Sequence, residues 1–364
     1  MSWQSGLRFR LAGFTVEVPL NTLLGVALIA WLWLPSFSGA SAAGQWGSAI
    51  VFAVALLVSV LLHELAHAVA ARRFGFDVIG ITLWAFGGFT SYRPVRNTPA
   101  RQAAIAVAGP ASTLLVAVAA WLLWLRLPDP TSALAEIIGA VALANGVVAV
   151  FNILPALPLD GGSVLAAGIW AVTGSASKGH RIAAYAGMVL AGLLVAVPLL
   201  LAVRSGGPVD IGYLGVSLLI AVFLFFGARS ALRQADLHAQ LDGRTAADLA
   251  TPALVVAPTA SLAALDDMLS RAPQPGRVLV LVGAPESGLQ GYVLPPSAAA
   301  VPAQQRAGTP VTAVTRNVPA WRALPADAPA ASALALLQQG ADPIVVLDAQ
   351  HRPIGVIIAG SATA

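Results

Sequence analysis

The sequence contains no cysteine in 364 residues. This absence excludes disulfide bonds, thiolate nucleophiles and cysteine-ligated zinc, so any metal site must use histidine and carboxylate ligands. Charge is also scarce, since only 10% of the residues are charged, 58% are hydrophobic and the mean hydropathy is +0.81. A typical soluble domain carries about 25% charged residues. The composition therefore predicts a polytopic membrane protein.

The few charges divide the chain in two. Residues 1–235 hold 13 basic and 7 acidic residues, and residues 236–364 hold 7 basic and 9 acidic residues. The composition changes at the same place from long apolar runs to a soluble mixture, which predicts a membrane domain over 1–235 and a cytoplasmic domain over 236–364. The basic residues are scattered among loops rather than clustered, so no nucleic-acid partner is expected despite the pI of about 10.1.

Six apolar segments are expected to cross the membrane as helices. They are approximately Leu20–Leu34, Ser48–Ala71, Gln102–Leu125, a segment from Ala133 past Trp170, Ile182–Val203 and Ile211–Leu232. The fourth is too long for one straight crossing and is broken by two prolines, Pro155 and Pro158. Met1–Val18 reads as a short head, and not as a cleavable signal peptide.

Arginine and lysine positions orient these segments. With a cytoplasmic N-terminus, eleven basic residues of the membrane domain face the cytoplasm and only two, Arg126 and Arg204, face the other side. This bias predicts a multi-pass protein of the cell membrane with both termini in the cytoplasm.

One stretch between the second and third segments does not read as a span. Phe76–Tyr92 is β-branched and aromatic and is interrupted by Gly87-Gly88, so it predicts strands or a re-entrant hairpin. The alternative is an ordinary loop. A strand beside an active site could pair with an extended substrate backbone.

The C-terminal part contains an imperfect internal repeat. Thr251–Val293 and Ala323–Ile358 each read as a turn, an amphipathic helix, a strand, a turn and a strand. Two such copies are expected to pack together as one α/β unit. The intervening stretch, Pro295–Asn317, is expected to be a loop with a short helix.

The second apolar segment carries a pattern with chemical meaning, HELAH, in which His63, Glu64 and His67 fall within five residues. On a helix His63 and His67 lie about 40° apart on one face, where they can ligate one metal ion, while Glu64 lies on the flank and can act as a general base. Such a pattern can also arise by chance. Inside a membrane, however, three ionisable groups are costly without a compensating partner, which favours a metal site.

A catalytic zinc site usually has three protein ligands, so two histidines are not enough. The other histidines, His180, His238 and His351, lie in predicted loops or in the soluble part. Asp160 is the better candidate, because it follows Pro158 inside the broken fourth segment. An aspartate at such a place could instead cap a helix N-terminus.

Together HELAH and NILPALPLDGG resemble the two signatures of the site-2 protease family of intramembrane zinc metalloproteases. The six-span plan and the C-terminal repeat resemble its SpoIVFB-type branch with a CBS domain pair, as in actinobacterial members. The resemblance implies one Zn²⁺ per chain held by His63, His67 and Asp160, with Glu64 as catalytic glutamate. It also implies that Asn152 helps to bind the substrate or oxyanion, and that the β segment with Gly87 and Gly88 contacts the substrate.

The resemblance further implies a substrate class, namely single-pass membrane proteins such as an anti-sigma factor or another signalling precursor. Membrane lipid surrounds such an enzyme, and a homodimer through the CBS pair is expected. Two residues depart from the family pattern, Ser163 after the LDGG motif and Thr113 after Gly109-Pro110, and neither is expected to touch the metal ligands. GYVLPPSAAA and GVIIAGSATA contain no aspartate for a ribose, so adenine nucleotides should bind weakly or not at all.

Two other functions compete with proteolysis. A transporter or channel regulated by a CBS pair would also combine several spans with the repeat, and an inactive relative could bind and retain membrane partners. The paired HELAH and LDGG motifs argue against the transporter, and the intact set of candidate ligands argues against the inactive relative.

Overall fold

A computed structural model describes residues 6–38, 41–84, 87–93, 97–206, 211–272, 278–284, 288–318, 322–338 and 340–358. The chain divides into two compact units, residues 1–236 and 237–364, which we name the membrane unit and the C-terminal unit. The boundary between the two units follows Asp236. Arg96 and the end of GVIIAGSATA, two features of the sequence predictions, lie outside the described residues.

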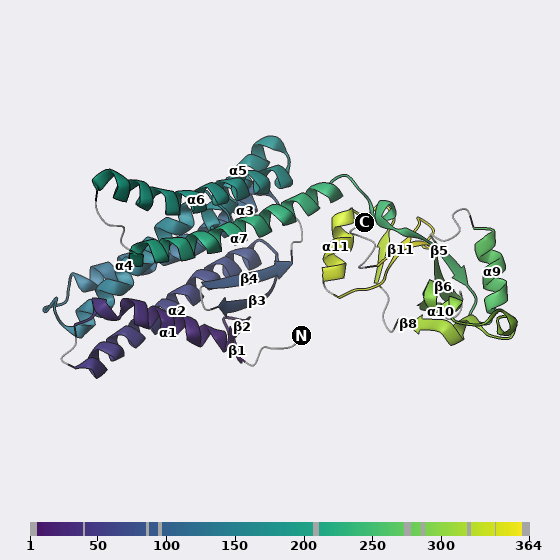
Figure 1. The fold of residues 1–364 in the computed structure, drawn as a ribbon, viewed down its shortest axis with the longest axis horizontal. Helices are drawn as coiled ribbons and strands as arrows, with labels where there is room; N and C mark the ends of the chain where they lie inside the picture. Colours follow the sequence, from purple (N-terminus) through teal and green to yellow (C-terminus); the bar gives the residue numbers. More distant parts are fainter. Residues whose placement is uncertain are drawn as a thin grey trace. The chain divides into compact units, whose positions relative to one another are not determined.

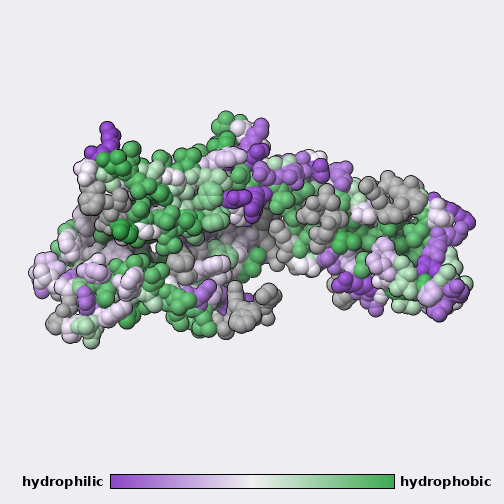
Figure 2. All heavy atoms as spheres, viewed as in Figure 1, coloured by the Kyte–Doolittle hydropathy of each residue, from purple (hydrophilic) through white to green (hydrophobic). Residues whose placement is uncertain are grey.

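Within the described residues of the membrane unit, five helices are long and apolar enough to cross a membrane (Figure 1). They are α2 (Ala42–Arg73), α3 (Pro99–Trp124), α4 (Ala133–Ile153), α6 (Ala176–Ser205) and α7 (Ile211–Leu241). Hydrophobic side chains gather over the surface of these helices (Figure 2), as lipid contact requires. The protein is therefore a multi-pass membrane protein, and its predicted fold class is confirmed.

Two of the six predicted segments, the first and the fourth, do not form a single membrane-spanning helix. The first forms only α1 (Asn21–Trp33) and the 3₁₀ turn η1 (Leu34–Ser36), and 13 helical residues span about 20 Å, less than the hydrocarbon core. The fourth breaks at its prolines, as predicted, into α4 and α5 (Asp160–Thr173). Because of this break, Asp160 is the first residue of α5, a helix that begins inside the membrane unit.

The predicted hairpin after α2 is present as β3 (Asp77–Trp84) and β4 (Gly87–Arg93), which pair antiparallel. The N-terminal head is also folded, which the sequence prediction missed. It forms a hairpin of β1 (Gly6–Leu11) and β2 (Phe14–Pro19), and β2 pairs parallel with β3. The resulting sheet has the order β1-β2-β3-β4, so β4 is an edge strand.

One face of this sheet packs against α2. Alternate residues of β2 and β3, including Phe14, Val16, Ile81 and Leu83, form a buried cluster with Ala68 of α2. Because the sheet contacts the helix that carries HELAH, β4 is held beside the candidate site.

The C-terminal unit contains two halves of the same design, which confirms the predicted repeat. The first half comprises β5 (Thr251–Val256), α9 (Leu262–Ser270), β6 (Leu279–Ala284) and β7 (Gly288–Val293), and the second comprises β9 (Arg322–Pro325), α11 (Ala330–Gln338), β10 (Ile344–Leu347) and β11 (Pro353–Ile357). In each half two parallel strands flank a helix and a hairpin follows. β5 and β11 pair antiparallel and join the halves into one sheet.

Smaller elements complete this unit. They are α8 (Ala246–Leu249), α10 (Pro295–Ala299), the 3₁₀ turns η2 (Ala303–Gln305) and η3 (Val311–Val314), and β8 (Thr315–Asn317). The stretch between the halves is thus irregular chain with short helices, as predicted, and ends in a short strand that pairs with β7.

Candidate metal centre

The two histidines of HELAH face the same side of α2. Their ring centroids are 4.7 Å apart, and their Nε2 atoms are 3.1 Å apart. Four residues correspond to little more than one helical turn, so the spacing alone brings the two rings close together, and they meet edge to face at 79°. Both rings are mostly buried, with 11% of each side chain exposed.

Asp160 brings its carboxylate to the same point from α5. Its Oδ2 lies 3.1 Å from His63 Nε2, and its Oδ1 lies 3.3 Å from His67 Nε2. The N-cap of α5 is Leu159, and no side chain caps that helix, so Asp160 does not serve as the cap that the sequence left open. Among the described residues these three form the one group of this kind, with ligand atoms within 4.8 Å of one another.

The spacing of this group, which we name the metal cluster, fits a tetrahedral zinc ion. Nitrogen and oxygen ligands at about 2.0–2.1 Å from such an ion stand about 3.3 Å from each other. The two histidine Nε2 atoms, 3.1 Å apart, are close to that separation, and each lies 3.1–3.3 Å from a different oxygen of Asp160. Two histidines and one carboxylate also leave a fourth position open, as catalytic zinc sites do.

The far nitrogen of each histidine is fixed by a partner on α3. His67 Nδ1 lies 2.7 Å from the carbonyl oxygen of Ile105, and His63 Nδ1 lies 2.8 Å from Thr113 Oγ1. A carbonyl oxygen can only accept, so His67 must donate from Nδ1, which leaves Nε2 free to ligate. Thr113 also donates its hydroxyl to the carbonyl oxygen of Gly109, which leaves its oxygen to accept from His63.

The expectation that Thr113 does not touch the metal ligands is therefore wrong. Gly109, one turn earlier on α3, also approaches the histidines, because a Cβ there would overlap both Nε2 atoms. The Gly109-Pro110 pair and Thr113 were visible in the sequence. The helix packing that brings them to His63 was not, because it depends on contacts between distant segments. For the other departure, Ser163, the described residues show no side-chain hydrogen bond to these ligands.

The loop between α4 and α5 determines the position of Asp160. The Leu157 N–H donates to the carbonyl oxygen of Ala183 on α6, at 3.0 Å. On α7, a Cβ at Gly227 would lie 2.5 Å from Cγ of Pro158. Since α6 and α7 both hold this loop, the position of Asp160 depends on helices that provide no ligand.

Glu64 is buried, with 6% of its surface exposed. Its carboxylate interacts electrostatically with all three members of the metal cluster. Strand β4 covers it. The hydroxyl of Thr90 donates toward Glu64 Oε2 at 2.8 Å, and a Cβ at Gly88 would lie 2.6 Å from Glu64 Cγ. Thr90 was not identified from the sequence. Because Thr90 follows Gly88 by two residues, both lie on the same face of a strand, and this spacing could have indicated that Thr90 lies near the site.

Two other predicted residues are not brought into contact with the metal cluster. Asn152 lies half-buried in the last turn of α4, and the described residues make no hydrogen bond with its side chain. Gly87 has a φ of +152°, a conformation that favours glycine, and no heavy atom would lie within 4 Å of an added Cβ. Their roles in substrate binding therefore stay predictions.

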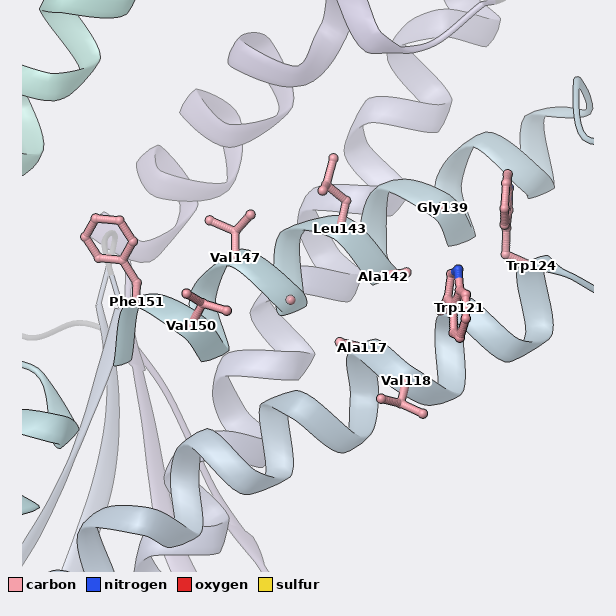
Figure 3. Close-up of a pocket in the computed structure, with 11 residues that line it drawn as sticks. Ala117, Val118, Trp121, Trp124, Gly139, Ala142, Leu143, Val147, Val150 and Phe151 are labelled. Atoms are coloured by element: carbon pink, nitrogen blue, oxygen red, sulfur yellow. The ribbon is translucent and has the colours of Figure 1, made fainter. Parts of the chain in front are cut away.

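The membrane unit also has a groove of about 600 Å³ between α3 and α4, apart from the metal cluster. Its lining is hydrophobic and runs from Trp121 and Trp124 at one end to Phe151 at the other (Figure 3). No carboxylate, histidine or hydroxyl lines it, so this groove offers apolar contacts and no catalytic group.

Comparison with known proteins bears on the same residues. The model of peptidase family M50 matches residues 51–129 and 128–194, which include HELAH and Asp160. A relative from Synechocystis sp., sll0528, and one from Mycobacterium tuberculosis, Rip3, are both named provisionally as zinc metalloproteases. They are 36% identical to this chain over 220 and 253 residues, which is 60% and 66% of its length.

The matches leave part of each relative uncovered. This chain spans 55% of the Synechocystis protein and 62% of the Mycobacterium protein, less than two thirds of either. A solved structure, the site-2 protease from Methanocaldococcus jannaschii, is 25% identical, with a TM-score of 0.43 over 62% of this chain and 95% of that chain. Residues 51–194 of the membrane unit therefore match peptidase family M50, and this matched region contains all three members of the metal cluster.

Proposed function

We propose that this protein is an intramembrane zinc metalloprotease that cleaves single-pass membrane proteins within or near their membrane span. The observation that carries the proposal is the metal cluster with a buried glutamate beside it. His63, His67 and Asp160 would hold one Zn²⁺, and Glu64, whose carboxylate is no member of that cluster, remains for proton transfer.

Zinc bound here supplies Lewis acidity, which makes water acidic enough to act as a nucleophile near neutral pH and polarises a carbonyl group. Glu64 accepts the proton of the attacking water at its carboxylate and then delivers it to the leaving amine. Thr113 and Ile105 keep the imidazole rings oriented during this cycle. Asn152 is proposed to hydrogen-bond the substrate backbone or the developing oxyanion.

The substrate is proposed to bind in an extended conformation along β4. A helical substrate buries its carbonyls in its own hydrogen bonds, so it must unwind before attack. β4 is an edge strand beside Glu64, and edge strands offer unpaired backbone groups that can bind another strand. Gly87 and Gly88, at the start of β4, would allow close approach of that backbone.

The active site is proposed to open to the cytoplasm. His67 precedes Arg72 by five residues, about 7.5 Å of helix, and the arginine bias places Arg72 on the cytoplasmic side. A reporter that is active only in the cytoplasm should therefore be active when it is fused after Ala364. If the reporter is instead active on the opposite side of the membrane, the proposed orientation is wrong.

Two alternative functions make different predictions about metal. A transporter or channel needs no histidine pair with an adjacent base, and an inactive relative needs neither zinc nor Glu64. Neither alternative explains why two histidines and one carboxylate bring ligand atoms within 4.8 Å of one another.

Metal analysis of the purified full chain tests the proposal. About one zinc per chain is expected in the wild type, with loss of zinc and of cleavage in His67→Ala and Asp160→Asn. His180→Ala is a matched control, because His180 contacts Gln102 and Ala176 outside the metal cluster. Wild-type zinc content and cleavage in Asp160→Asn would remove Asp160 from the site, and a metal-free wild type would reject the proposal.

A further inference from the structure

We propose that Thr90 is a positioning residue that holds the Glu64 carboxylate in place, with Gly88 providing the space. This inference rests on the proposed function, because it assigns Glu64 the role of proton acceptor. It concerns a strand residue that lies 26 positions away from Glu64 and outside the HELAH motif.

The periodicity of a strand explains why these two residues act together. Gly88 and Thr90 are two apart on β4, so they occupy the same face of the strand, which faces α2. Gly88 leaves room for the glutamate chain, since a Cβ would lie 2.6 Å from Glu64 Cγ and 3.1 Å from Oε1. Contacts under 3.0 Å require movement, so any larger residue at position 88 would displace the carboxylate.

Thr90 provides the hydrogen bond. Its hydroxyl lies 2.8 Å from Glu64 Oε2 and 3.0 Å from the Glu64 backbone oxygen, and its single proton is shared between these two acceptors with the carboxylate the nearer one. No other hydrogen bond to this carboxylate is recorded among the described residues. A buried carboxylate with one donor depends strongly on that donor, because its loss leaves the group poorly solvated.

The arrangement fixes one oxygen of Glu64 and leaves the other for chemistry. Oε2 is bound by Thr90, so Oε1 is the atom available to accept a proton from water. Rigid support of this kind matters because misplacing a catalytic group by about 1 Å can lower a rate about 100-fold. The same strand is proposed to pair with the substrate, so β4 sets the positions of both the base and the peptide.

Kinetic comparison of three variants tests this role. Thr90→Val removes the hydroxyl at nearly constant shape, and Thr90→Ser keeps it. Thr173→Val is the matched control, because the Thr173 hydroxyl donates to the carbonyl oxygen of Ile169 within α5. We expect kcat for a tagged single-pass membrane protein to fall about 10- to 100-fold in Thr90→Val, with KM, zinc content and melting temperature unchanged. Thr90→Ser and Thr173→Val should keep wild-type kcat. Wild-type kcat in Thr90→Val, or no rescue by serine, would overturn the inference.

An infrared measurement separates this inference from the proposed function. The chain has only four glutamates, so carbon-13 labelling of glutamate gives few bands, and subtracting the Glu64→Gln spectrum identifies the Glu64 carboxylate. That band should shift in Thr90→Val and keep its wild-type frequency in Thr90→Ser. An unshifted band in Thr90→Val contradicts the hydrogen bond whether or not the protein cleaves. Wild-type cleavage by Glu64→Gln would instead reject the proposed role of Glu64. The band shift would then still test whether Thr90 donates a hydrogen bond to the Glu64 carboxylate.

Discussion

At the scale of single residues, the orientation of the metal ligands depends on neighbours that are not ligands. His63 and His67 are set by their spacing on α2, but the rotation of each ring is set by α3. Thr113 provides a side-chain oxygen for His63, whereas Ile105 provides a backbone oxygen for His67. Only the first of these partners can be removed by substitution without changing the helix backbone.

Thr113→Val is therefore expected to lower zinc affinity about 10- to 100-fold, the usual effect of losing a partner of a ligating histidine. Titration of the purified protein with zinc against a competing chelator measures this change. Thr113→Ser should retain most of the affinity. Ser112→Ala is a control, since Ser112 bonds only the carbonyl oxygen of Gly109 within its own helix. Wild-type affinity in Thr113→Val would mean that helix packing alone orients His63.

At the scale of elements, the loop before α5 carries the third ligand and is held by α6 and α7. The contact between Gly227 and the Pro158 ring provides a test of this support, because Pro158 lies two residues before Asp160. A methyl group at position 227 must displace the proline, and overpacking of this kind typically costs about 1–3 kcal/mol.

Gly227→Ala is expected to reduce zinc occupancy and cleavage several-fold, because the displaced loop moves Asp160 from the histidines. Gly215→Ala is the matched control on the same helix, since an added Cβ there would meet no heavy atom within 4 Å. Zinc occupancy and cleavage rate of the two variants are compared directly. Equal values would show that the loop tolerates movement of α7.

The same elements show what the sequence could and could not predict. HELAH and LDGG identified all three members of the metal cluster, because spacing on a helix and a broken apolar segment are local signals. The hairpin of β3 and β4 was predicted from β-branched and aromatic residues around a glycine pair. The β1–β2 hairpin was missed although its pattern was present: Arg8 and Arg10 alternate with Phe9, and Ala12-Gly13 form a turn with positive φ at both positions.

Other features depend on contacts between distant segments. Thr90 reaches Glu64 across 26 residues, and Thr113 reaches His63 across 50. No periodicity in the sequence specifies which residue of a strand or helix meets a particular side chain of another. The first apolar segment forms the short helix α1, which starts two residues after β2 ends at Pro19.

At the scale of the whole molecule, α7 is continuous across the boundary between the two units, since it runs from Ile211 to Leu241 and the boundary follows Asp236. We propose that the C-terminal unit is a CBS pair that regulates cleavage, and that it forms a homodimer. A ligand that binds one conformation of this unit could alter the proteolytic rate through α7.

Adenine nucleotides are not expected to be that ligand. No carboxylate follows Gly291-Tyr292-Val293 or Gly355-Val356-Ile357 to bind a ribose hydroxyl, and a site without that partner loses much of its affinity. Calorimetry on the full chain with ATP and AMP should show no binding in the micromolar range. Micromolar binding of either nucleotide would contradict this expectation.

The central claim is that Glu64 serves as the base beside a metal held by other residues, and Glu64→Gln tests it most directly. The substitution keeps the size of the side chain and removes its basicity. Cleavage of a tagged single-pass membrane protein and zinc content are measured on the same purified preparation. The account predicts one zinc per chain, as in the wild type, and no detectable cleavage. Loss of zinc would show that Glu64 is a ligand, and wild-type cleavage would contradict the proposed mechanism.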